Sequence, residues 1–183
     1  MTYYGASDLA RSFRTVRTNT LRIAEEIPED RYDFRPTQDS RSVREILVHM
    51  LVSSRSGYLG HAVRKVTTFV GIDFPTLIRE RLEQEKQLST ASKARIIDEL
   101  RADGENWGTY LDAVKEDELA VIIPFSPPAV PAAKSRFEMI LSAKEHEMHH
   151  RAQLMVLERL LGLVPHLTRD RQARMAPPPP RTH

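Results

Sequence analysis

The residues best suited to chemistry are two histidines, His146 and His150, four positions apart in a segment free of proline and glycine. Residues at this spacing lie one turn apart on one face of an α-helix. Their ring nitrogens can therefore reach the same metal ion at about 2 Å each, the usual Zn–N distance. An apolar stripe on the same segment predicts that positions 146 or 147 and 150 face the core. Unpartnered imidazoles in a core would cost free energy, and a bound metal ion would remove that cost.

A third histidine, His49, follows Ile46 by three residues and lies at the edge of the apolar face of another predicted helix. If the two helices pack together, His49 can point at the His146 and His150 pair. Three histidines with one open position are typical of a metal site that binds water or substrate. The alternative interpretation is that all three are hydrogen-bonded histidines of an ordinary core.

The other histidines carry weaker predictions. His149 points about 100° around the helix from His150. We therefore expect it to contact a metal ligand without binding the metal itself, or to lie at the surface. We expect His61, His166 and His183 to be ordinary surface residues.

Residues 146–150 also spell H-E-x-x-H, the zinc-binding helix of many metalloproteases, with Glu147 as a candidate general base. The longer protease pattern fails, because Gln153 and Val156 stand where glycine and a third histidine are required. A downstream glutamate ligand is also lacking, because the only later glutamate, Glu158, lies on the same predicted helix two turns further on. The sequence therefore argues against a protease.

A di-iron bundle is a second alternative, since Glu147 and His150 form a Glu-x-x-His pair. Such a centre needs a second copy of that pair. Glu45 and His49 are spaced by four rather than three, so the second copy is missing.

The elements that must position these residues are four amphipathic helices. The apolar spacing predicts helices over about 8–27, from 40–42 to 57 or as far as 65, over 92–115, and over 135–161. Two capping boxes, Ser42 with Glu45 and Ser135 with Glu138, mark helix starts. The pattern favours an all-α four-helix bundle, up-down with longer connections. We expect one domain over 1–165 and a basic, proline-rich tail over 166–183.

The remaining segments are less regular. Residues 71–87 are ambiguous and contain a charged helical piece at 79–86 after Pro75. Residues 119–123 form the only strand-like patch, and a proline-rich loop follows it to 133. The run of prolines at 177–180 favours a polyproline stretch.

Composition excludes several functions. The chain has 183 residues, no cysteine and a formal charge of +2. It therefore has no disulfide, no thiolate nucleophile and no sulfur-based metal site. Residues from 169 onward carry +3 and the remainder −1, so the folded part has no basic excess for binding nucleic acid.

Membrane and export functions also receive no support. The longest uncharged run, 119–133, has 15 residues and four prolines, whereas a membrane-spanning helix needs about 20 apolar residues. Charged residues begin at Asp8, where a signal peptide needs an apolar stretch. We therefore expect a cytoplasmic protein.

Two stretches resemble the DinB/YfiT-like family of metal-binding four-helix bundles. One is Arg35-Pro36 followed by RSVREILVH at 41–49. The other is HEMHHRAQL at 146–154, which is followed by LGLVP at 161–165. They resemble the start of the family's second helix and its last helix, and the resemblance extends over about residues 8–165.

The resemblance implies that His49, His146 and His150 bind one divalent metal ion, commonly zinc or nickel. It also implies a four-helix fold and, as in the better understood relatives, a low-molecular-weight thiol whose pKa the metal lowers. Ala152 replaces the usual glycine of the family motif, and Arg41 stands where many members have tryptophan.

Three functions are compatible with this pattern. The first is a metal-dependent, thiol-dependent S-transferase acting on a small molecule, with Glu147 or His149 orienting a ligand or moving a proton. The second is a hydrolase that uses metal-bound hydroxide with Glu147 as base. The third is a non-catalytic bundle stapled by the metal. We expect Arg151 and Gln153 to make structural polar contacts, and related proteins suggest a homodimer.

Overall fold

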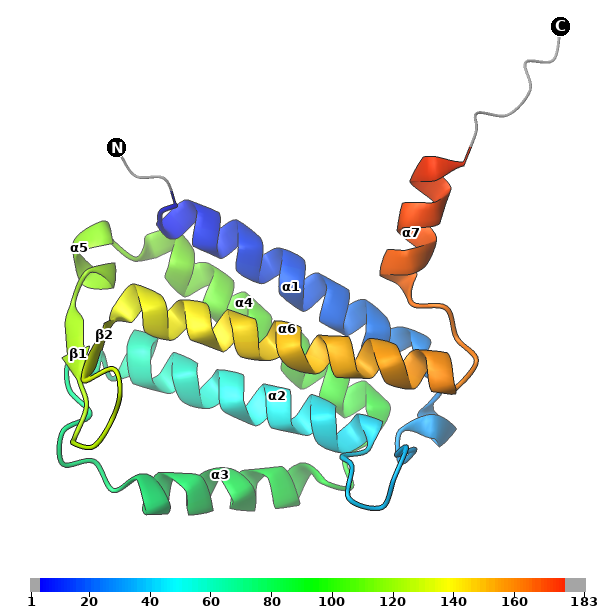
Figure 1. The fold of residues 1–183 in the computed structure, drawn as a ribbon, viewed down its shortest axis with the longest axis horizontal. Helices are drawn as coiled ribbons and strands as arrows, with labels where there is room; N and C mark the ends of the chain where they lie inside the picture. The colour runs from blue at the N-terminus through cyan, green and yellow to red at the C-terminus, as the bar shows by residue number, and fades with distance from the viewer. Residues whose placement is uncertain (1–3, 177–183) are drawn as a thin grey trace, which may run out of the picture.

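The computed structural model describes residues 4–176 and contains four long helices packed as a bundle (Figure 1). They are α1 (Ala6–Glu26), α2 (Val43–Tyr58), α4 (Lys93–Ala113) and α6 (Arg136–Leu160). Helices α1 and α2 each pack against both α4 and α6, so α1 and α2 lie diagonally across the bundle. The predicted all-α four-helix bundle is therefore confirmed.

The helix starts follow the predicted capping boxes. Ser42 Oγ accepts from the Glu45 backbone N–H at 3.2 Å, and Glu45 Oε2 accepts from the Ser42 N–H at 2.7 Å. Ser135 and Glu138 make the same pair of bonds at the start of α6. These bonds satisfy N–H groups that have no partner within the helix. They fix where the two histidine-bearing helices begin.

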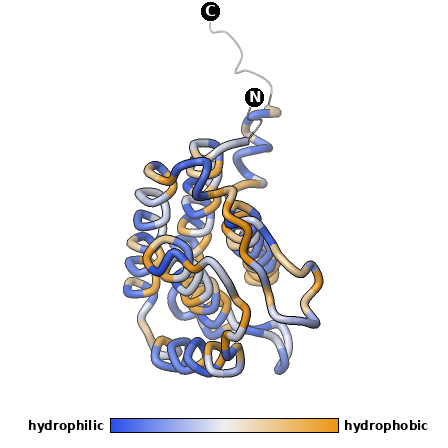
Figure 2. Tube along the Cα trace, turned by 90° about the vertical axis from the view of Figure 1, so that its left-hand side faces the viewer, coloured by the Kyte–Doolittle hydropathy of each residue, from blue (hydrophilic) through white to orange (hydrophobic). Residues whose placement is uncertain are grey.

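The apolar core consists of two clusters along the bundle axis. One is built around Ile23, Leu47, Leu100 and Leu154, and the other around Leu9, Trp107, Leu111 and Ile140. In Figure 2, which looks along the bundle, apolar and polar residues alternate along the helices, as amphipathic helices require.

The ambiguous segment forms a helix, α3 (Phe74–Leu88), which lies alongside α2 outside the bundle. It follows η2 (Leu59–Val63), a π-helical continuation of α2. Only Leu88 of α3 is buried, and Phe74, Ile78 and Leu82 remain 42–57% exposed. Its apolar spacing is weakly used in packing, which explains why the sequence does not define it clearly.

The other connections between the bundle helices are long, running from Glu26 to Val43 and from Ala113 to Arg136. They contain η1 (Glu29–Arg31) and α5 (Glu116–Leu119). Strands β1 (Ile122–Pro124) and β2 (Ala133–Ser135) pair antiparallel, with Ile123 opposite Lys134. The predicted extended patch thus exists but is shifted, because Leu119 ends α5 and the strand begins at Ile122.

The chain after residue 165 differs from the expected tail. Pro165 precedes a helix, α7 (His166–Met175), that contacts the end of α1. Arg22 pairs with Asp170 at 2.9 Å and Arg169 pairs with Glu26 at 2.6 Å. Polar tethers rather than an apolar stripe hold α7, so apolar periodicity could not reveal it. The predicted polyproline stretch at 177–180 lies outside the described residues.

Two surface predictions were wrong. His166 is fully buried, and its Nε2 lies 3.2 Å from Asn19 Oδ1. His61 is 5% exposed and lies under Arg136, which donates to the His61 carbonyl at 3.2 Å. Both residues lie near the ends of helices. There, apolar spacing does not predict which way a side chain points. His183 lies outside the described residues.

No helix in residues 4–176 is both long enough and apolar enough to cross a membrane.

Candidate metal centre

The structure brings His49 from α2 together with His146 and His150 from α6. The Nε2 atom of His146 lies 3.1 Å from the Nε2 of His49 and 3.1 Å from the Nε2 of His150. One ring nitrogen from each residue lies within 4.8 Å of the others. Nitrogen ligands of a tetrahedral zinc ion, at about 2.0–2.1 Å, are themselves about 3.3 Å apart. The spacing of the three rings therefore fits one metal ion.

Two neighbouring side chains fix the orientation of the rings. Glu85 of α3 places Oε1 2.8 Å from His49 Nδ1, and Gln153 of α6 places Oε1 2.8 Å from His150 Nδ1. Both partners are acceptors, so each Nδ1 carries the proton. The Nε2 atoms of His49 and His150 then present lone pairs to the centre of the cluster.

This tautomer assignment tests whether a cation fits. His146 Nε2 can donate its single proton to only one of its two neighbours. At least one of the two 3.1 Å contacts is thus left without a proton between its nitrogens, so at least one Nε2 lone pair has no hydrogen-bond donor. A cation between the rings would satisfy such a lone pair by coordination, and outer hydrogen bonds of this kind are usual for metal-binding histidines. The donor set fits a divalent ion that accepts imidazole ligands.

The environment favours the neutral imidazole of His146 and of His150. Burial, followed by the neighbouring His150 and His49, lowers the pKa of His146 to about 4. Burial also lowers the pKa of His150. Neutral imidazole is the form that binds metal ions, so the two histidines of α6 are in the metal-binding form near neutral pH.

His149 packs its ring edge-on against that of His150, with the ring centroids 4.9 Å apart, and is not one of the three converging ligands. Its Nε2 lies 3.2 Å from Gln153 Nε2, and Gln153 in turn holds His150. The sequence assigned Gln153 a structural contact at the bundle edge, and the structure gives it a contact with a candidate ligand.

Glu147 does not join the histidines. It is 5% exposed, and its carboxylate pairs with Arg17 of α1, with Nε–Oε1 at 3.0 Å and Nη2–Oε2 at 2.9 Å. Neighbours on a helix point about 100° apart, so Glu147 faces the bundle interior while His146 faces α2.

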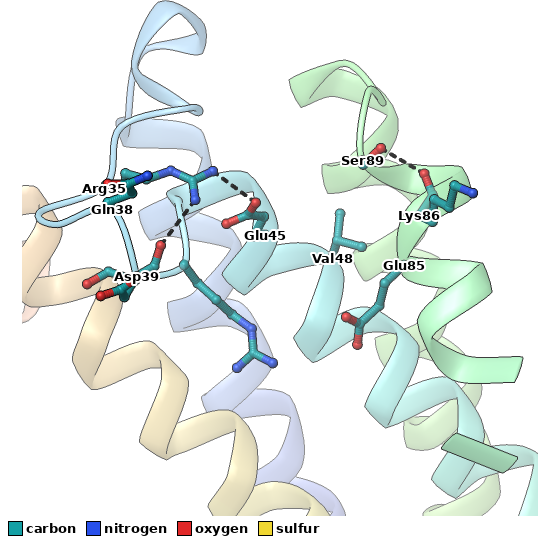
Figure 3. Close-up of a pocket in the computed structure, with 10 residues that line it drawn as sticks. Arg35, Gln38, Asp39, Glu45, Val48, Glu85, Lys86 and Ser89 are labelled. Atoms are coloured by element: carbon teal, nitrogen blue, oxygen red, sulfur yellow. Dashed lines mark hydrogen bonds and ion pairs between the residues drawn. The ribbon is translucent and has the colours of Figure 1, made fainter. Parts of the chain in front are cut away.

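Two cavities are lined in part by Glu85 and by Gln153, the residues that orient His49 and His150. The first, of about 370 Å³, includes Glu45, Val48 and Glu85 in its lining (Figure 3). The second, of about 610 Å³, has apolar walls from Ile46, Val156 and Leu157 and reaches Gln153. Asp39, Ser40 and Arg41 line both cavities. Each cavity therefore touches one of the residues that orient a candidate ligand.

Sequence reasoning missed Glu85. It lies on α3, the ambiguous segment, among other glutamates of similar surroundings such as Glu80 and Glu83. Nothing in the local sequence distinguishes it, because its contact with His49 depends on how α3 lies along α2.

The fold and the site together define the class of this protein. It is a four-helix bundle with a candidate metal centre made of three histidines. The family model of the DinB superfamily matches residues 12–154. The chain belongs to this superfamily.

Solved structures support the fold. YfiT from Bacillus subtilis, described as a probable metal-dependent hydrolase with an unusual four-helix bundle topology, superposes with a TM-score of 0.66 at 14% identity. That match covers 89% of this chain and 91% of YfiT. The DinB-like protein YjoA from the same organism gives 0.56 at 24% identity, covering 84% and 92% of the two chains.

A third structure, the sibling lethal factor precursor DfsB, gives a TM-score of 0.66 at 13% identity and covers 89% of this chain and 100% of DfsB. No curated protein sequence matches the chain significantly. At these identities the structural likeness establishes the fold alone.

Proposed function

We propose that the chain binds one divalent metal ion, zinc or nickel, through His49, His146 and His150, and acts as a thiol-dependent S-transferase on a small molecule. The observation that carries the metal site is the convergence of three Nε2 atoms whose rings are held by acceptors on Nδ1. Membership of the DinB superfamily supports the same site.

When bound, a divalent ion at this site supplies a positive centre that favours the ionised form of a thiol near neutral pH. The chain's own residues do the rest. Glu85 and Gln153 hold the protons on the outer ring nitrogens, so that the inner nitrogens remain ligands. The two cavities offer room for a thiol and an electrophile on either side of Arg41.

Hydrolysis is the second candidate, and the specific observation that favours it is the description of YfiT as a probable metal-dependent hydrolase. The hydrolase hypothesis that uses Glu147 as general base requires the Glu147 carboxylate to leave Arg17, where it makes a bidentate contact. The geometry therefore gives that role less support than it gives the metal site.

The first test is metal content by mass spectrometry on protein purified without a metal-affinity tag. The wild type is expected to hold one divalent ion per chain, and His150→Ala is expected to lose it. His149→Ala is the matched control, because His149 lies beside His150 but is not one of the three converging histidines. Absence of metal from the wild type, even after incubation with zinc and with nickel, would remove the proposed site.

The second test separates the activities. Metal-loaded protein is offered electrophiles with and without low-molecular-weight thiols, and esters and amides without thiol. Turnover that requires a thiol supports the transferase, and turnover of esters without thiol supports the hydrolase. A blank screen, together with a lower melting temperature after metal removal, supports a metal that only staples the helices.

A further inference from the structure

A buried layer of charged and polar side chains separates the two apolar clusters of the bundle. Arg17 of α1 is 5% exposed, and Asp103 of α4 and Glu147 of α6 are 3% and 5% exposed. On α1, α4 and α6 the residues before and after these positions belong to different apolar clusters. The polar layer is thus at the middle of the bundle, at the level of His146 and His150.

Arg17 is the centre of this layer. Besides its bidentate contact with Glu147, Nη1 donates to the Leu100 carbonyl at 2.6 Å. Nη2 lies 3.1 Å from Asp103 Oδ2 and donates to Ser54 Oγ at 3.2 Å. Ser54 Oγ donates to Asp103 Oδ2 at 2.6 Å. One guanidinium therefore connects α1 to all three of the other bundle helices.

Stability alone does not explain such a group. Burying two carboxylates and one guanidinium costs desolvation free energy, and replacing buried ionic clusters by apolar residues is often neutral or stabilising. A network of this kind does supply directional contacts, which apolar packing lacks. Such contacts can fix how the helices are oriented relative to one another.

The network connects to both histidine-bearing helices. Glu147 is the residue after His146 on α6, and Ser54 lies five residues after His49 on α2. A metal site needs its ligands held to within about 0.5 Å and 10–20°. The rotation of α6 about its own axis decides whether His146 and His150 face His49. The contact of Glu147 with Arg17 restricts that rotation, because both carboxylate oxygens accept from the guanidinium.

We propose that Arg17, Asp103 and Glu147 are positioning residues for the three-histidine site, holding α6 and α2 in the rotation that makes His49, His146 and His150 converge. This inference rests on the proposed metal binding. It assigns Glu147 to orienting the helix instead of transferring a proton.

The test replaces the whole cluster by apolar residues, R17M/D103L/E147M, so that no unpaired charge stays buried. Zinc affinity is measured by competition with a chelator, the visible spectrum of the cobalt-loaded protein reports ligand geometry, and urea unfolding of metal-free protein reports stability. We expect the unfolding midpoint to hold or rise. Zinc affinity should fall about tenfold or more, by analogy with losses on removing outer contacts of metal ligands, and the cobalt spectrum should change.

Arg136→Met is the matched control, because Arg136 is an equally buried arginine of α6 at the far end of the helix. It donates to the Val66 carbonyl at 2.9 Å and to that of His61. We expect it to lower the unfolding midpoint and leave zinc affinity and the cobalt spectrum unchanged. Wild-type affinity and spectrum in the triple variant would overturn the inference, as would an equal loss in Arg136→Met.

Glu147→Gln is a milder variant that keeps an acceptor for Arg17 and leaves Asp103 to balance its charge. A positioning role predicts a smaller, several-fold loss of zinc affinity. A purely catalytic role predicts unchanged affinity and spectrum with loss of turnover, which would contradict the inference. If the wild type itself binds no zinc, the proposed function fails together with this inference. If the wild type and all variants bind alike, only the inference fails.

Discussion

At the scale of single residues, Glu85 shows how a side chain outside the ligand set can control a metal site. Its carboxylate accepts from His49 Nδ1 at 2.8 Å, and both side chains are largely shielded from water. A carboxylate on the outer nitrogen fixes the tautomer and makes the inner nitrogen a stronger ligand.

We predict that Glu85→Gln lowers zinc affinity about 10- to 100-fold, the usual range for loss of such a contact. Gln retains an acceptor but loses the negative charge that strengthens the ligand. Chelator competition measures the change. Glu83→Gln is the control, because Glu83 is exposed on the same helix. Equal affinities for the two variants would contradict the role given to Glu85.

A second residue-scale feature is Glu158, which is fully buried near the end of α6 with no hydrogen-bond partner for either carboxyl oxygen. Burial, then the nearby Glu26, raises the pKa of Glu158 to about 7, while Arg169 and Arg159 oppose the shift. Below about pH 4.5 the carboxyl is neutral in both folded and unfolded chains. Between about pH 4.5 and 7 the unfolded chain ionises first, so stability falls as pH rises.

We predict that Glu158→Gln removes most of this pH dependence. The wild type should lose up to about 3 kcal/mol of unfolding free energy across the window, at about 1.4 kcal/mol for each unit of pKa difference. The variant should therefore gain stability relative to the wild type at pH 8 and not at pH 4.5. Urea unfolding at the two pH values measures this, with exposed Glu145→Gln as control. A variant that tracks the wild type at both values would refute the assignment.

At the scale of elements, the sequence predicts helices well where one face is apolar and a capping box marks the start. The boundaries expected near Ser42 and Ser135 agree with the structure, and so do the four bundle helices. The His146 and His150 pair was also accessible, because helical spacing alone brings the two rings to one face.

The features that could not be predicted from the sequence depend on contacts between helices. Glu85 acts through the placement of α3 on α2, and Glu147 turns inward because Arg17 lies on the facing helix. His166 is buried because ion pairs hold α7 against α1. Such polar contacts leave no periodic pattern in the chain, so apolar spacing cannot predict them.

Helix α3 provides the element-scale prediction. It buries only Leu88 and connects to α2 through Glu85 on His49 and through Arg81 on Ser53. Helices with few buried apolar contacts open more readily. We predict faster backbone hydrogen exchange in α3 than in α2 and α4.

Bound metal should slow hydrogen exchange in α3 more than in α4. A metal on His49 Nε2 makes the His49 Nδ1–H group a stronger hydrogen-bond donor to Glu85 of α3. Hydrogen exchange read by mass spectrometry tests this, and Glu85→Gln should abolish the metal effect. Equal protection of α3 and α4 by metal would contradict the coupling.

At the scale of the whole molecule, a metal ion held by His49 and by the His146 and His150 pair links α2 to α6 across the bundle. An ion that binds the folded chain and not the unfolded chain stabilises the fold by mass action. At a free concentration about 1,000 times the dissociation constant, the gain is about 4 kcal/mol. In a protein of this size each kcal/mol raises the melting temperature by about 2–4 °C.

We therefore predict that saturating zinc raises the melting temperature of metal-free protein by about 8–16 °C. The increase should grow with the logarithm of zinc concentration, which separates site binding from a general salt effect. His150→Ala should lose the increase in melting temperature, because only two of the three ligands remain. His149→Ala should keep it. An increase of the same size in both variants would show that zinc stabilises the fold elsewhere, and the link between α2 and α6 would have to be abandoned.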